Sequence, residues 1–332
     1  MPTNSVRKLR TLLPLLALAA CAPAGGGTAA APAAEIQGER VLRDLSVLAA
    51  DSMEGRRVGT PGNARARAHL LAELGRMGLE PVGSGYEHPF TFTPRSGGAQ
   101  ARGINLLGKV TGTRWPDRYV VVSAHYDHVG SGRPVDGDSI YNGADDNASG
   151  TAALLELARH FRANPPESTV IFAFFDAEEV GLQGARAFVA NPPVPRERIA
   201  LNVNMDMVSR SERGELYAAG AAKWPFLRPY LEQVAARAPV RLLLGHDTPE
   251  PTPQDDWTLQ SDQGAFHQAG IPFVYFGVED HPGYHKPSDE VEAVTPEFYV
   301  GAVRTIADAV RTLDRGVDEI VRARSAMPAP AQ

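Results

Sequence analysis

Acidic and histidine side chains recur in this 332-residue chain at points where apolar runs end. Between two such points lies the segment 142–150, Asn-Gly-Ala-Asp-Asp-Asn-Ala-Ser-Gly, whose adjacent carboxylates precede a helix-like run. Carboxylate oxygens and imidazole nitrogens suit Zn²⁺ where no thiolate is available. The residues singled out as ligands or their neighbours are His125, Asp127, Asp145, Asp146, Glu178, Glu179, Asp206 and His285.

With one acid taken from each adjacent pair, the candidate ligands are the set His, Asp, Glu, Asp, His, which is three carboxylates and two imidazoles. That number is too large for one tetrahedral zinc that keeps an open position. It suits two zinc ions that share one bridging carboxylate and lie about 3.5–4 Å apart. The pattern therefore indicates a co-catalytic metal centre.

Each group also has an ordinary structural explanation. The adjacent aspartates can cap the following helix, and the adjacent glutamates can form a solvated turn. Asp206 can belong to a buried salt bridge, His125 can be a core histidine, and His281 and His285 can be loop residues at the surface. Taken together, these structural explanations are weaker than each is alone, because all of them would have to hold at several strand ends of one sheet.

The elements that must position these residues are predicted by apolar periodicity. Strands alternate with helices, which predicts an α/β domain whose mostly parallel mixed sheet is sandwiched between helices. The carboxyl ends of parallel strands meet at one edge of a sheet, where binding sites form. The expected strands are 86–92, 103–110, 119–124, 169–175, 199–204, 215–218, 240–244 and 272–277, and the expected helices are 35–50, 64–77, 151–162, 182–189, 225–236, 264–268 and 296–314.

The amino-terminal residues predict export. Arg7, Lys8 and Arg10 precede the apolar run 12–20, which ends at Cys21, the chain's single cysteine. This order resembles a bacterial lipoprotein signal with Cys21 as the lipidated residue, and the alternative is an ordinary secretory signal. Ala22 then favours the outer membrane, facing the periplasm or the cell surface, with the membrane as a partner through the lipid anchor.

Composition bounds the rest of the chain. With 43% hydrophobic and 22% charged residues, the chain has ordinary globular composition. The net charge of -6, without a long basic block, gives no case for a nucleic acid partner. We expect a signal peptide at 1–21, a flexible tether at 22–34, one catalytic domain at 35–323 and a disordered tail at 324–332.

The motifs resemble those of the co-catalytic zinc exopeptidases of peptidase clan MH, a family that includes secreted bacterial leucyl aminopeptidases and glutamate carboxypeptidase. They occur in the family's order over about residues 41–310, so the resemblance implies the zinc-exopeptidase (phosphorylase/hydrolase-like) architecture. The matching stretches are His125-Tyr-Asp127, Gly143-Ala-Asp-Asp146-Asn-Ala-Ser-Gly150, Glu178-Glu179-Val-Gly181, Asn204-Met-Asp206 and Tyr284-His285.

The resemblance implies two zinc ions per chain, with Asp146 bridging them. His125 and Asp206 would complete the ligands of one ion. Glu179 and His285 would complete those of the other. A peptide would be the substrate, and cleavage at its amino end would make the protein an aminopeptidase.

The resemblance also implies catalytic roles. Glu178 would be the general base that deprotonates the attacking water and returns the proton to the leaving amine. Asp127 would accept the ring N–H of His125 and fix its tautomer. Tyr284 would help to hold the oxyanion.

Three alternatives remain open in the sequence. A carboxypeptidase of the same family needs a cationic clamp, for which Arg210 and Arg213 lie near Asp206. A glutaminyl cyclase shares the fold but uses one zinc, and a binding module such as a transferrin receptor has lost the site. Gln263 stands where the family often carries histidine, and residues 255–257 either line the substrate pocket or lie at the surface.

Overall fold

The computed structural model describes residues 1–3, 35–94, 97 and 99–327. Residues Ala34–Gln332 form one compact unit. Cys21, almost all of the predicted signal and tether, and the last five residues of the predicted tail lie outside the described residues. Within the described residues, no helix is long and apolar enough to cross a membrane.

The unit is built on a nine-stranded mixed sheet. Eight of its strands follow the order β1-β3-β7-β4-β8-β11-β9-β10, and the ninth, β2, pairs with β3. The four central strands, β7, β4, β8 and β11, run parallel, and β3 and β9 are antiparallel to their central neighbours. The prediction of a mostly parallel mixed sheet is confirmed. The strands are β1 Glu80–Pro81, β2 Glu87–Phe92, β3 Ala101–Val110, β4 Trp115–His125, β7 Ser168–Phe175, β8 Ile199–Met205, β9 Glu215–Ala219, β10 Arg241–Leu244 and β11 Phe273–Gly277.

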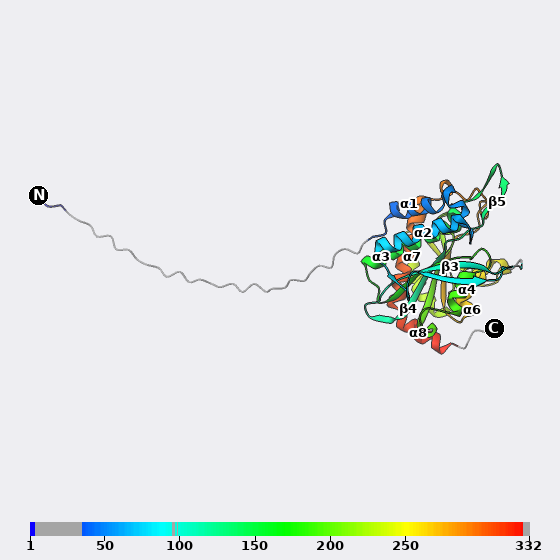
Figure 1. Cartoon of the computed structure of the whole chain (residues 1–332). Helices are drawn as coiled ribbons and strands as arrows, with labels where there is room; N and C mark the ends of the chain where they lie inside the picture. Colours follow the sequence, from blue (N-terminus) through cyan, green and yellow to red (C-terminus); the bar gives the residue numbers. More distant parts are fainter. Residues whose placement is uncertain (4–34, 95–96, 98, 328–332) are drawn as a thin grey trace. The chain divides into compact units, whose positions relative to one another are not determined.

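Helices cover both faces of the sheet (Figure 1). They are α1 Gly38–Leu48, α2 Pro61–Met77, α3 Gly150–Ala163, α4 Gln183–Ala190, α5 Arg228–Ala235, α6 Gln263–Gln268, α7 Pro296–Arg315 and α8 Val317–Ala326. Strand β7 is buried at every position, and its side chains alternate between two cores. Phe172 packs in the larger core with α1, α2, α3, α5 and α7, whereas Ile171 packs in the smaller core with α4 and α6.

Three parts of the fold differ from the sequence prediction. The expected tail is helical at its start, because α8 extends to Ala326 and buries Val317 and Ile320 against the larger core. The expected loop 51–63 contains a 3₁₀ turn, Asp51–Arg56, and the first residues of α2, where Thr60 accepts a hydrogen bond from the Asn63 N–H at 3.3 Å.

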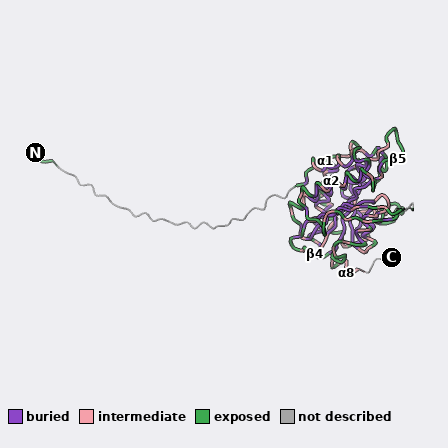
Figure 2. The backbone as a smooth tube through the Cα atoms, viewed as in Figure 1, coloured by how far each residue is buried: buried purple, intermediate pink, exposed green. Residues whose placement is uncertain are grey.

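The third difference is a hairpin that the sequence pattern did not predict. It consists of β5 Gly130–Val135 and β6 Asp138–Tyr141. Its polar, glycine-rich strands lack an apolar face, which removes the alternation that identifies a half-buried strand. Figure 2 shows β5 as largely exposed, in contrast to the buried central strands.

The carboxyl ends of the central strands bring the candidate residues together. In the paired registers, His125 lies beside Phe175 and Ser123 lies beside Asn204. The segments that carry Asp127, Glu178 and Asp206 therefore leave the sheet at one edge. Loops from α3, α6 and the region after β11 can reach the same edge.

Candidate metal centre

Two groups of potential metal ligands lie at this edge, and Asp146 belongs to both. The first group also contains His125 and Asp206. The second group also contains Glu179, His285 and a residue that sequence reasoning had not assigned, His128. In each group one donor atom per residue lies within 4.8 Å of all the others. All five residues predicted as ligands are thus brought together, with Asp146 in the shared position.

All three residues of the first group are buried, whereas the second group includes the exposed His285. The Nε2 atom of His125 lies 3.2 Å from Asp206 Oδ1 and 3.4 Å from Asp146 Oδ1. His125 is almost completely buried, and Asp206 is fixed at the end of β8 by its N–H, which donates to the Phe276 carbonyl at 3.0 Å. A core histidine without further function would not need two carboxylates.

The second group uses the other oxygen of Asp146. His285 Nε2 lies 3.0 Å from Asp146 Oδ2 and 3.2 Å from Glu179 Oε2. His128 Nδ1 lies 2.7 Å from Glu179 Oε1 and 3.6 Å from Asp146 Oδ2. A signal for His128 was present in the sequence, because it lies three residues after His125 in the same turn.

The loop before α3 holds Asp146 from both sides. The main-chain N–H groups of Asp145 and Asp146 donate to the Asp289 carboxylate at 3.0–3.1 Å. Asn147 accepts from the Gly150 N–H at 2.8 Å and donates to the Met205 carbonyl at 2.9 Å. Helix capping, the structural alternative for this segment, therefore falls to Asn147 and leaves the Asp146 carboxylate free for the two groups.

Asp145 is separate from both groups. Its Oδ1 accepts hydrogen bonds of 2.7 Å from the N–H and the hydroxyl of Ser209. Its Oδ2 lies 3.2 Å from His281 Nε2. Asp145 thus fastens the loop to the segment after β8, and His281 is a partly buried partner of that loop.

A buried arginine joins the loops of the centre. Arg56 is 1% exposed, and its guanidinium donates to four main-chain carbonyls, those of Leu48, Tyr126, Asn142 and Gly143, at 2.6–3.0 Å. Burial lowers the pKa of Arg56 to about 10, while the negative charge of Asp146 opposes that shift. Sequence reasoning placed Arg56 in a loop, because its partners come from three distant segments.

Asp127 is correctly placed near His125, but its detailed role differs from the prediction. The Nδ1 atom of His125 lies 3.1 Å from the Asp127 main-chain carbonyl and 3.7 Å from its carboxylate. The carboxylate instead accepts the N–H groups of Glu178, at 3.0 Å, and Glu179, at 3.4 Å. The turn after β4 folds the carbonyl under the imidazole ring, so the carboxylate is available to fix the glutamate turn.

The adjacent glutamates point to different partners, as predicted. Glu179 contacts His128 and His285, whereas the Glu178 carboxyl makes no hydrogen bond or ion pair to the described residues. Burial raises the pKa of Glu178 well above its ordinary value, although His125 opposes the shift. Such a carboxyl is suited to proton transfer near neutral pH.

The charges of the centre fit a pair of divalent cations. Burial alone would raise the pKa of Asp146, yet the imidazoles of His128, His125 and His285 hold it well below its usual range. No lysine or arginine among the described residues forms an ion pair with a carboxylate of either group. Buried carboxylates that are paired with neither lysine nor arginine are suited to hold cations, and the oxygen and nitrogen donors of the two groups suit Zn²⁺.

A cavity of about 300 Å³ opens beside the two groups. Glu178 and Tyr284 line it, and the Tyr284 ring stacks on His285 with a centroid distance of 4.0 Å. Its remaining wall is mixed, with apolar and charged side chains that include Leu182, Arg186, Met207, Trp257, Leu259, Tyr275, Val278 and Asp280. The cavity has room for a small peptide end.

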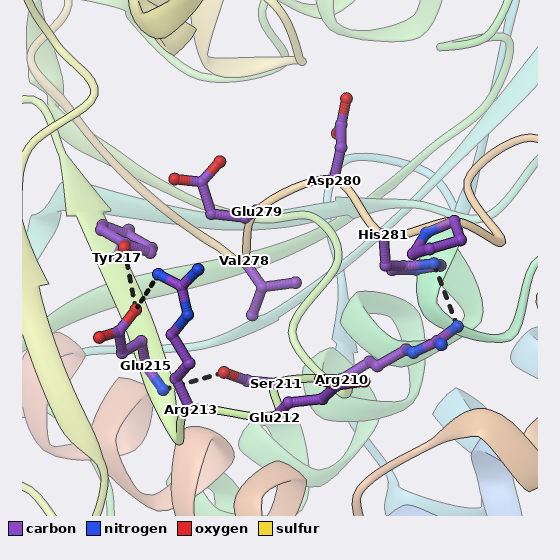
Figure 3. A pocket seen from close by; sticks show the side chains of 11 residues that line it. Arg210, Ser211, Glu212, Arg213, Glu215, Tyr217, Val278, Glu279, Asp280 and His281 are labelled. Atoms are coloured by element: carbon purple, nitrogen blue, oxygen red, sulfur yellow. Dashed lines mark hydrogen bonds and ion pairs between the residues drawn. The ribbon is translucent and has the colours of Figure 1, made fainter.

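Arg210 and Arg213, the two arginines near Asp206 in the chain, line an adjoining cavity of about 280 Å³, shown in Figure 3. Arg210 Nη1 lies 3.2 Å from His281 Nδ1, and Arg213 pairs with Glu215 at 3.7 Å. Neither lines the cavity at the metal groups. The cation that does line it is Arg186.

The structure shows which residues of the 246–263 region line the cavity and which do not. Gln263 is fully buried and connects Asn204, at 3.0 Å, to the Trp257 carbonyl, at 2.7 Å, so it supports the cavity wall from behind. Trp257 lines the cavity itself. Asp255 caps a short 3₁₀ turn, and Asp256 forms an ion pair with a lysine.

The chain is similar to known metallopeptidases. The profile described as "Peptidase family M28" matches residues 105–310. "Aminopeptidase YwaD" of Bacillus subtilis (strain 168) is 32% identical over 209 residues, which are 58% of this chain and 41% of that protein. A "Probable zinc metalloprotease" of Pyrenophora tritici-repentis (strain Pt-1C-BFP) is 38% identical over 107 residues, 32% of this chain and 24% of that protein. The chain spans less than half the length of these two curated relatives.

Solved structures share the fold. BSAP, a zinc aminopeptidase from Bacillus subtilis, superposes with a TM-score of 0.66 at 17% identity over 83% of this chain and 95% of its own. The Fimbriiglobus ruber glutaminyl cyclase gives a TM-score of 0.65 at 20% identity over the same shares. At these identities the likeness concerns the fold, which an aminopeptidase and a cyclase have in common.

Proposed function

The chain belongs to peptidase family M28, and from that membership we propose that it is a di-zinc aminopeptidase. It would remove N-terminal residues from peptides by hydrolysis. One observation carries this proposal: Asp146 turns one oxygen to each ligand group, and the Glu178 carboxyl lies unengaged in the cavity beside them. The named relatives, an aminopeptidase and a zinc metalloprotease, support the same reaction class.

Zinc ions held by these ligands would polarise the peptide carbonyl and make a bound water acidic. The protein's own part in the reaction is proton transfer and orientation. Glu178 would take the proton of the attacking water and return it to the leaving amine. The Tyr284 hydroxyl, which has no partner among the described residues, would donate a hydrogen bond to the oxygen where negative charge develops.

Two side chains of the cavity bear on which peptide end is bound. Asp280 lines the cavity and forms no ion pair in the described part of the chain, so its carboxylate is available to a substrate α-ammonium group. Arg186 favours the second candidate, a carboxypeptidase, because it offers a cation to a substrate carboxylate. The aminopeptidase reaction is preferred because the curated relative aligned over the longer segment carries that name.

The test measures zinc content of the purified full chain together with hydrolysis of matched peptides that are free, N-acetylated or C-amidated. We expect two zinc ions per chain and cleavage of the free and C-amidated peptides alone. Loss of C-terminal residues from N-acetylated peptides would replace the proposal with a carboxypeptidase. One zinc ion with cyclisation of N-terminal glutamine would replace it with a cyclase.

The general base is tested by Glu178→Gln. This variant should keep its zinc and lose about 10²–10⁴-fold in kcat. The matched control is Glu197→Gln, an exposed glutamate on the turn before β8, which should leave both quantities unchanged. Normal turnover by the Glu178 variant would exclude it as the base.

The residues before the domain support a separate proposal, that the protein is an exported lipoprotein anchored through Cys21. The basic residues, the apolar run and the position of the single cysteine support it. Replacing Cys21 with Ser should release the protein from the membrane fraction. Continued membrane association of that variant would contradict lipidation.

A further inference from the structure

The two ligand groups differ in the number of protein donors, and this difference has a chemical consequence. We propose that His128 is a fourth ligand of the ion held by Glu179, His285 and Asp146. That ion is then coordinatively closed, and the ion held by His125, Asp206 and Asp146 alone keeps a position for water. The inference rests on the zinc pair of the proposed function and goes beyond the five ligands that the sequence resemblance implies.

The distances between donor atoms match a tetrahedral site. Zinc–nitrogen and zinc–oxygen bonds of about 2.0–2.1 Å place tetrahedral ligands about 3.3 Å apart. The short contacts in the second group are 2.7, 3.0, 3.2 and 3.6 Å, with His128 and His285 on different oxygens of Glu179. Those in the first group are 3.2 and 3.4 Å. In each group one donor atom per residue lies within 4.8 Å of every other, so the donors are close enough to share one ion.

The His128 ring fills a space in the loop that carries the bridging aspartate. The residue is fully buried, and a Cβ atom on Gly143, whose φ is +56°, would approach the ring Cδ2 to 2.4 Å. His128 also meets His285 edge-on, with ring centroids 5.7 Å apart. A glycine in the loop of the bridging aspartate thus leaves the space that the imidazole fills.

The polar contacts of His128 converge on the second group. Its Nε2 atom has no hydrogen-bond partner among the described residues, so the ring is held by its Nδ1 side. That atom faces the carboxylates of two different residues, Glu179 and Asp146. A single hydrogen bond to Glu179 would need only one of them, whereas a shared cation accounts for both.

The two ions would then have different roles, because the protein fills every position of one and leaves one position of the other open. Structural zinc sites have four protein ligands, and catalytic sites have three with one open position. A closed second ion has no position for a substrate amine, which leaves Asp280 as the group that receives it.

The experiment is ¹¹³Cd NMR of the full chain, labelled with ¹⁵N-histidine and loaded with ¹¹³Cd²⁺. We expect two cadmium signals, one split by two ¹⁵N nuclei and one split by a single ¹⁵N nucleus. His128→Asn should convert the first signal to single splitting and leave the second unchanged. The control is His88→Asn, whose imidazole contacts the Val82 carbonyl far from both groups and should alter neither signal.

The possible outcomes separate this inference from the proposed function. Two signals that are each split once in the unsubstituted protein would overturn the role of His128 and leave the two-metal centre intact. A single cadmium signal would contradict the two-metal centre itself. Should His128→Asn fail to fold, the splitting in the unsubstituted protein still decides, because it counts bound imidazoles directly.

Discussion

Among the described residues we compare two buried clusters of charge, which differ in the partners of their carboxylates. One joins α1, α2 and α3, and its acids are Asp44, Glu73 and Glu156. The other is the metal centre at the carboxyl edge of the sheet. Both bury carboxylates that would be costly to leave unpaired.

The helical cluster supplies its own cations. Arg40 makes a two-pronged contact with Glu156, at 2.7 and 3.0 Å. Arg159 reaches Asp44 at 2.6 Å and Glu73 at 2.9 Å, and Glu73 also pairs with Arg76. Burial alone would lower the pKa of Arg159, but Asp44 and Glu73 raise it. The acids of this cluster are therefore paired with guanidinium groups of the chain itself.

The metal centre has carboxylates and imidazoles in place of such pairs. Its nearest buried guanidinium, that of Arg56, donates to main-chain carbonyls and forms no ion pair with a carboxylate. The difference teaches that acids buried with arginines are structural, whereas acids buried with histidines are prepared for cations from solution. The following predictions test that distinction, beginning with the largest effect.

Removing the shared carboxylate should have the largest effect. Asp146→Asn takes a charged donor from both groups, so we expect loss of both zinc ions and of all measurable hydrolysis. Zinc content and turnover of the purified variant measure this. The control is Asp145→Asn, which should keep both ions because Asp145 faces Ser209. An Asp146 variant that retained two ions would contradict the bridging position.

Replacing Arg56 tests whether the guanidinium positions the loops of the centre. Arg56→Met removes four hydrogen bonds to carbonyls, and we expect zinc affinity to fall about 10–100-fold, as for other residues that orient metal ligands. Arg56→Lys should recover part of that loss. Competition with a chelator measures the affinity. Arg159→Met is the control from the helical cluster and should lower stability with unchanged affinity.

Replacing Glu156 tests the opposite cluster. Glu156→Gln removes a fully buried charge whose partner Arg40 is partly exposed, and we expect a loss of about 1–3 kcal/mol in the free energy of unfolding. Zinc content and kcat should not change. Chemical denaturation gives the free energy, with Asp117→Asn in an exposed pair as the control, expected to cost less than about 1 kcal/mol. A loss of zinc in the Glu156 variant would contradict the separation of the clusters.

Two further buried carboxyls near the metal centre, those of Asp262 and Asp176, should respond to pH in the opposite direction from the helical cluster in the metal-free protein. Burial raises the pKa of Asp262 to about 8 and that of Asp176 to about 7. Such carboxyls are protonated in the fold, so stability falls as pH rises from about 4 to about 8. Burial would raise the pKa of Glu73 too, but Arg76 and Arg159 hold it below its ordinary value, so its contribution is lost on acidification.

The measurement is the Tm of zinc-free protein between about pH 5 and about pH 8. We expect a decrease of several degrees, and Asp262→Asn should flatten it. Of the two carboxyls, Asp262 gives the clearer test, since neither of its oxygens has a partner among the described residues. A Tm that rose over this range would contradict the predicted loss of stability from the buried carboxyls at the sheet edge.

Much of the site could be predicted because its chemistry is local in sequence. The central strands are buried on both faces and therefore appear as continuous apolar runs. The residues that follow those runs must share one edge of a parallel sheet. Strand-end placement supplied the candidate acids and histidines, and the family resemblance then assigned the five ligands and the separate roles of Glu178 and Glu179.

The contributions of His128, Arg56 and Gln263 could not be predicted in the same way. Each depends on contacts between segments far apart in the chain, such as the four carbonyls around Arg56. The polar hairpin was missed because it has no apolar face, and the last helix because it buries only Val317 and Ile320, too few positions to show a helical period. Local patterns carry no information about either kind of feature.

The sequence by itself determined the order of strands and helices, the chemical type of the ligands and their place at the strand ends. Only the tertiary structure decided which oxygen of Asp146 faces which histidine, and that His128 joins the second group. It also decided that the Asp127 carboxylate fixes the glutamate turn. The physical reason is that side-chain types follow from composition and spacing, whereas distances of about 3 Å between donors arise only when separate segments pack.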